Sequence, residues 1–106
     1  MHVVVDFDIS SHVCGRGATV VLKGELDSAS APRLANEIRS VVSESAVHVT
    51  VDLEGTTFVD LSGLRALMAA LSAVRRHGGD IVLQAPPKSL QKVLELSGAA
   101  DLFVVK

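Results

Sequence analysis

Between residues 47 and 53, apolar side chains alternate with polar ones in the segment VHVTVDL. This period of two predicts a β-strand with one buried face. From residue 64 to residue 74 the apolar side chains instead recur at intervals of three and four, which predicts an amphipathic helix. The buried stripe of that helix is expected to consist of Leu64, Leu67, Met68, Leu71 and Val74.

The same patterns predict the elements in the rest of the chain. Further strands are expected at residues 3–9, 18–23, 80–84 and 102–105, with a turn region at residues 10–17. Further helices are expected after residue 30 and at residues 89–97. The order is therefore β-β-α-β-α-β-α-β. Because strands that alternate with helices form parallel units with right-handed crossovers, we expect one α/β domain, residues 1–106, with a mixed β-sheet. Its antiparallel edge is the opening hairpin, and its helices should pack mainly on one face.

The connection Glu54–Gly63 is where we expect the site of the protein. It leads into a helix, whose first backbone N–H groups are unpaired and favour an anion or a partner's hydrogen-bond acceptor. Residues 26–30 precede the first helix and should lie beside this connection, since the carboxyl ends of parallel strands meet at one edge of a sheet. Together the two segments would form a docking surface, with polar groups around exposed Leu26 and Leu61.

A plainer alternative is that the polar residues of both segments only cap the two helices. The side chains that could serve as caps are Asp27, Ser28 and Ser30 for the first helix, and Asp60 and Ser62 for the second. The local sequence alone leaves both interpretations open.

The composition of the chain argues against several classes of function and location. The net charge is −2, and three phenylalanines are the only aromatic residues, so the chain lacks the basic stripe and stacking rings of a nucleic-acid binder. No apolar run approaches the roughly 20 residues of a membrane span, so we expect no direct membrane insertion. Cys14 has no partner for an internal disulfide, and the first residues do not resemble a signal peptide, so we expect a cytoplasmic protein. The apolar content of 48% would also permit a homodimer.

Catalytic and metal chemistry find little support in the sequence. The four histidines are scattered without the spacing of a metal site, and Cys14 lies in no CxxC motif. Ser62 lies in Leu-Ser-Gly rather than in the Gly-x-Ser-x-Gly motif of a nucleophilic serine. We therefore expect no catalytic residue, no metal and no cofactor, and a serine hydrolase that uses Ser62 is the weakest alternative.

Four segments, in order, resemble the STAS domain of bacterial anti-sigma factor antagonists. Residues 20–27 (VVLKGELD) are similar to an early strand of that family, and residues 51–53 followed by 58–64 (FVDLSGL) resemble its central signature, usually Asp-Ser-Ser/Thr-Gly-Leu. Residues 79–83, and 93–98 with 102–103, match its C-terminal third.

The resemblance implies a non-enzymatic regulator that binds a serine-kinase-type anti-sigma factor and frees a sigma factor for transcription. It also implies partner contacts from Leu26, Asp27, Ser28, Ser30, Phe58, Asp60, Leu61, Ser62, Gly63 and Leu64. A second interpretation within this family is a partner-binding subunit of a transporter, such as a lipid-transport complex, or of a sensory complex.

The chain departs from the family pattern at the position of the phosphorylation switch. In the family the kinase phosphorylates the serine directly after the signature aspartate, but here Leu61 follows Asp60. Ser62 matches the second Ser/Thr position, and one residue along a helix is a rotation of about 100°. Two hypotheses follow: either the protein escapes the switch, which we favour, or Ser62 has become the acceptor.

Overall fold

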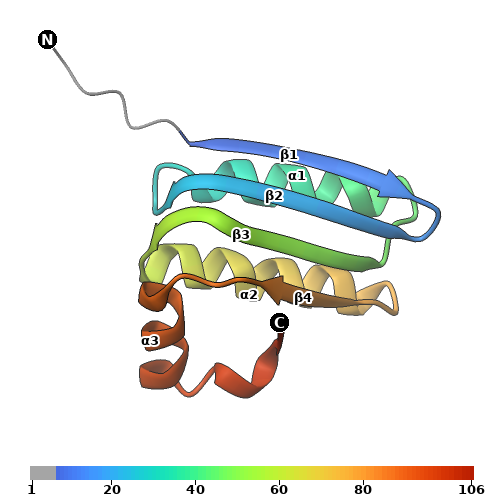
Figure 1. Ribbon diagram of the computed structural model, residues 1–106. Coiled ribbons are helices and arrows are strands. Elements are labelled where there is room, and N and C mark those ends of the chain that lie inside the picture. Colours follow the sequence, from blue (N-terminus) through green and yellow to red (C-terminus); the bar gives the residue numbers. More distant parts are fainter. Residues whose placement is uncertain (1–6) are drawn as a thin grey trace, which may run out of the picture.

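The computed structural model describes residues 7–106 and contains a five-stranded sheet in the order β1-β2-β3-β4-β5 (Figure 1). The strands are β1 (Asp8–Cys14), β2 (Gly17–Leu26), β3 (His48–Val59), β4 (Asp80–Gln84) and β5 (Val104–Val105). The helices are α1 (Ala31–Ser43), α2 (Leu61–Arg76) and α3 (Lys88–Ser97), followed by the short 3-10 helix η1 (Ala100–Leu102). The expected order of strands and helices is confirmed.

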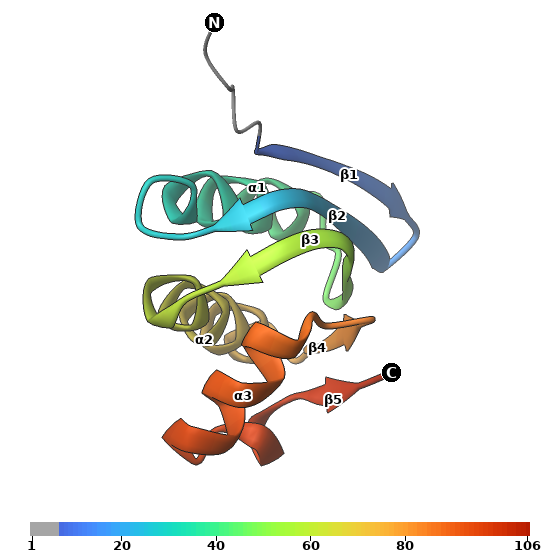
Figure 2. The same cartoon turned by 60° about the vertical axis from the view of Figure 1, so that its left-hand side comes forward.

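The sheet is mixed, as expected. β1 pairs antiparallel with β2, and the pairs β2–β3, β3–β4 and β4–β5 are parallel. Each parallel strand is added on the same side of the one before it, so right-handed crossovers bring the connecting helices to the same face. α1 and α2 lie side by side behind the sheet, and α3 packs against β3 and α2 (Figures 1 and 2).

The core lies between the sheet and these helices. Val49, Val51 and Leu53 point into it from β3, as their alternation with polar residues predicts. Each fully buried side chain of this size contributes about 1.5–3 kcal/mol relative to an exposed one. The buried residues of α1 and α2 are Leu34, Ile38, Val41, Gly63, Leu64, Leu67, Ala70, Leu71 and Val74. Met68 is the exception to the predicted stripe of α2, because its side chain is 38% exposed.

The first strand is displaced from its predicted position. It was expected at residues 3–9, with a turn at 10–17, but β1 runs from Asp8 to Cys14; residues 3–6 lie outside the described residues. The turn shrinks to two residues, Gly15 and Arg16, because Gly15, with φ of 62°, adopts the left-handed backbone that closes a tight hairpin in which Cys14 pairs with Gly17. The polar residues 10–12 are tolerated in β1 because it is an exposed edge strand.

The connection expected at Glu54–Gly63 is also mostly strand. β3 continues to Val59 because its pairing with β2 continues through two register shifts, leaving Asp60 as the single residue between β3 and α2. The Thr56 side chain is buried, and its hydroxyl donates to the Leu22 carbonyl at 3.0 Å. A side chain at Gly55 would begin 2.9 Å from Lys23 Cγ. Small residues here thus let β3 pass close to β2 and do not mark a loop.

Candidate functional site

Asp60 joins the end of the sheet to the start of α2. Its backbone is extended, and its Oδ1 accepts the Gly63 N–H at 2.9 Å, so the carboxylate caps the helix. Its own N–H donates to the Leu26 carbonyl at 3.3 Å. The β2–α1 and β3–α2 junctions therefore lie side by side, as the sequence predicted.

Gly63 is the point at which α2 comes closest to β2. A Cβ at this position would lie 2.5 Å from the Leu26 carbonyl oxygen and 2.8 Å from Val59 Cγ1. The first contact is with backbone, which cannot rotate away as a side chain can. The absence of a side chain at Gly63 thus fixes how α2 starts against the end of the sheet.

The β2–α1 junction is stabilised by Asp27 and Ser30. Asp27 Oδ1 accepts the N–H groups of Ala29 and Ser30 at 3.0 and 3.1 Å. The Ser30 hydroxyl accepts the Asp27 N–H at 3.0 Å and donates to the Glu25 carbonyl at 2.7 Å. The expectation that these side chains cap the first helix is wrong in detail, because Ser30 at the N-cap of α1 makes no side-chain hydrogen bond to the helix. The two side chains instead shape the turn that leads into α1.

The expected contact residues divide into buried and accessible groups. Leu26 was expected to be exposed, but its side chain is fully buried. It occupies the inward face of β2, where its Cγ would lie 3.0 Å from a Cβ added to Gly63. Ser30, Gly63 and Leu64 are buried as well and support the surface from beneath. The accessible members define what we call the docking face: Asp27, Ser28, Phe58, Asp60, Leu61 and Ser62.

Phe58 and Leu61 are the apolar part of the docking face. Their side chains are 45% and 50% exposed, although both are large and hydrophobic. Ser62 is half-buried, whereas Leu61 is exposed. The residue that carries a hydroxyl, Ser62, is therefore less accessible than its neighbour Leu61. The role of these residues in binding a partner remains a prediction.

Ser89 also positions the site, although nothing in the sequence singles it out. Its Oγ accepts the Val59 N–H at 3.0 Å and so ties α3 to the residue before Asp60. The two residues are 30 positions apart. A serine near the start of a predicted helix is too common to mark a site, and only the fold brings it to the end of β3.

No helix within residues 7–106 is long and apolar enough to cross a membrane. In the same range, no three His, Cys, Asp or Glu side chains are grouped so that they could hold a metal ion.

Comparison with known proteins identifies the family to which this chain is similar. A family model described as "Mlab, STAS domain" matches residues 13–105. BtrV of Bordetella bronchiseptica, named as a candidate anti-sigma factor antagonist, is 29% identical over 84 residues, which are 79% of this chain and 72% of BtrV.

Solved structures share the fold. An anti-sigma factor antagonist from Mycobacterium paratuberculosis is 22% identical with a TM-score of 0.82, over 99% of this chain and 89% of that chain. The anti-sigma factor antagonist SpoIIAA of Bacillus, in its unphosphorylated form, is 20% identical with a TM-score of 0.78, over 95% and 88% of the two chains.

Proposed function

This chain belongs to the STAS-domain family, and on that basis we propose that it is an anti-sigma factor antagonist, a cytoplasmic regulator without catalytic activity. It binds a serine-kinase-type anti-sigma factor through the docking face and thereby frees a sigma factor for transcription. The observation that carries the proposal is the exposure of Phe58 and Leu61, at 45% and 50%, beside the carboxylate of Asp60.

The docking face is suited to binding because its backbone is already ordered. The Asp60 cap, the hydrogen bond from Asp60 to Leu26 and the anchor at Ser89 hold both junctions in place. A surface that is ordered before binding loses less conformational entropy when the partner arrives. An exposed leucine surrounded by polar groups can then fill an apolar pocket of the partner, as the central contacts of protein interfaces commonly do.

Leu61 also removes the usual phosphorylation switch. A phosphoserine adds nearly two negative charges, and beside Asp60 it would repel an acceptor-binding partner and resist desolvation. Leucine at that position has no hydroxyl to modify. Ser62 lies one position further around α2 and is less accessible, so the kinase partner does not reach it. The protein then stays competent to bind in the presence of ATP.

The names of the relatives support this proposal. BtrV, the mycobacterial protein and SpoIIAA are all described as anti-sigma factor antagonists or candidates for that role. The solved structures bear on the fold, and the sequence match to BtrV bears on the family.

The proposal is tested by mixing the purified chain with the anti-sigma factor and its sigma factor. We expect a stable complex of chain and anti-sigma factor on size-exclusion chromatography, and release of the sigma factor measured by run-off transcription. If the chain instead copurifies with a transporter ATPase and leaves every candidate anti-sigma factor unbound, the transporter-subunit interpretation replaces this one.

A further inference from the structure

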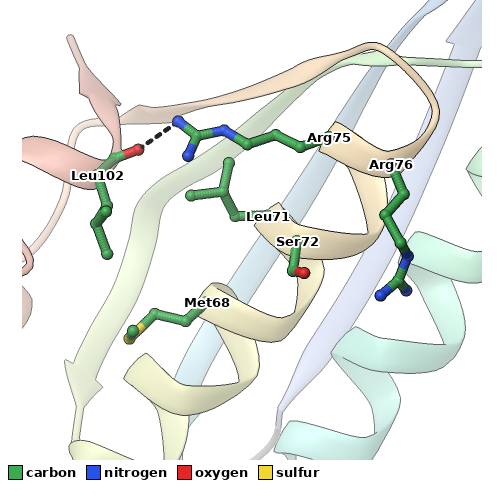
Figure 3. A pocket seen from close by; sticks show the side chains of 6 residues that line it. All are labelled: Met68, Leu71, Ser72, Arg75, Arg76 and Leu102. Atoms are coloured by element: carbon green, nitrogen blue, oxygen red, sulfur yellow. Dashed lines mark hydrogen bonds between the residues drawn. The ribbon is translucent and has the colours of Figure 1, made fainter.

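A groove runs between the second half of α2 and η1, away from the docking face. It encloses about 420 Å³. Figure 3 shows the side chains that line it, which are Met68, Leu71, Ser72, Arg75 and Arg76 from α2 and Leu102 from η1. We call it the α2–η1 groove.

The floor of the groove is apolar and accessible. Met68 and Leu102 are 38% and 37% exposed, and because both line the same groove they form an apolar patch rather than isolated exposed side chains. Methionine is flexible and polarizable and adapts to apolar groups of different shapes. The groove can therefore accept a large apolar side chain from a partner.

The wall of the groove is positively charged. Arg75 spans it, donating from Nη2 to the Leu102 carbonyl at 2.9 Å (Figure 3). Its Nε lies 3.4 Å from Asp80 Oδ1. Asp80 thus offsets the charge of Arg75, but Arg65 and Arg76 are exposed on the same helix. α2 carries three arginines and no aspartate or glutamate, in a chain whose net charge is −2.

Helix stability explains only part of this arrangement. Arginines in a last turn interact favourably with the helix dipole, which accounts for Arg75 and Arg76. It does not account for Arg65, near the start of α2, or for the exposure of Met68 and Leu102. The combination of an apolar floor, Arg76 in the lining of the groove and Arg65 on the same exposed face of α2 indicates an apolar and acidic ligand.

The groove is continuous with the docking face. Leu61, Arg65, Met68 and Ser72 are separated by four, three and four residues, so they share one face of α2, and all four are exposed. A partner that binds over Leu61 can therefore extend along this face of α2 and reach the groove.

We propose that the α2–η1 groove is a second contact for the same anti-sigma factor, an inference that rests on the proposed function. The groove takes a segment of that partner in which a large apolar side chain stands next to carboxylates. The apolar side chain packs on Met68 and Leu102, and the carboxylates face Arg76 and Arg65.

The test is the affinity of the full chain for the anti-sigma factor at low and high salt. Arg76→Glu should weaken binding about tenfold at low salt, mainly through slower association, and the difference should shrink at high salt. Arg16→Glu is the matched control, because Arg16 is exposed in the β1–β2 turn at the opposite edge of the sheet, and it should change the affinity less than about twofold.

A second measurement needs no charge change. Met1 and Met68 are the two methionines of the chain, so the methyl resonance of Met68 can be assigned by comparison with Met68→Leu. It should shift when the anti-sigma factor is added. Suppose that the resonance stays in place and Arg76→Glu binds like the wild type, while Leu61→Asp does not bind. The α2–η1 groove then does not contact the anti-sigma factor, and only the docking face binds it.

Two other outcomes also overturn the inference. If Leu61→Asp, Arg76→Glu and the wild type all bind equally, the proposed function itself is wrong at this surface. If the Met68 resonance shifts with the concentration of the chain alone, the groove binds a second copy of this protein and not the anti-sigma factor.

Discussion

Leu61→Asp should weaken binding to the anti-sigma factor roughly 100-fold, which corresponds to about 2.7 kcal/mol. Leu61 is half-exposed at the start of α2, where the proposal places it at the centre of the contact. The substitution removes its apolar area and buries a carboxylate beside Asp60 in the complex. Isothermal titration calorimetry on the purified proteins would measure the loss.

The fold should not suffer from this change, so binding and stability can be separated. The first turn of α2 contains no acidic residue, and a carboxylate there interacts favourably with the helix dipole, by about 0.3–1 kcal/mol. Leu96→Asp is a matched control, since Leu96 is a leucine of α3 that is 78% exposed and lies outside the docking face. If both variants bind alike, Leu61 is not an anchor of the interface.

Gly79→Ala should destabilise the fold by about 3 kcal/mol or more. A Cβ on Gly79 would lie 1.7 Å from the Val47 carbonyl oxygen, which already accepts the Asp80 N–H at 3.0 Å. The added methyl group must therefore separate the start of β4 from β3. The free energy of unfolding in urea, followed by circular dichroism, would measure the cost.

Gly17→Ala is the matched control for Gly79→Ala. Gly17 also lies at the beginning of a strand, but a methyl group added there would have the Cys14 and His48 carbonyl oxygens as its nearest atoms, each 3.6 Å away. This is ordinary van der Waals contact, so we expect a change below about 1 kcal/mol. Equal stability of the two variants would mean that the α2–β4 turn moves freely away from β3.

Several parts of the fold could be predicted because local patterns and tertiary packing favour the same structure. The alternation of apolar and polar residues in β3 and the helical spacing of apolar residues in α2 each correspond to one buried face in the structure. Gly78, with φ of 83°, adopts the left-handed backbone that glycine commonly takes just after a helix. The adjacency of the two junctions followed from strand direction alone, and the Asp60–Leu26 hydrogen bond confirms it.

The errors have physical causes that the local sequence does not show. Leu26 was expected on the surface because the strand was predicted to stop at residue 23, whereas β2 continues and turns Leu26 inward. The segment after Glu54 was expected to be a connection, but irregular pairing with β2 keeps it in the sheet. The close approach of Gly79 to Val47 depends on a contact across the fold, which the local sequence does not show.

We propose that this chain binds a kinase-type anti-sigma factor without being phosphorylated. Intact mass spectrometry after incubation with ATP and an anti-sigma kinase that is shown to bind the chain tests this proposal. Leu61→Ser, which restores the hydroxyl after Asp60, serves as the positive control and should gain one phosphate. We predict that the wild type forms the complex with no change in mass. A single phosphate on the wild type that disappears in Ser62→Ala would contradict the account, because the switch would then have survived at Ser62.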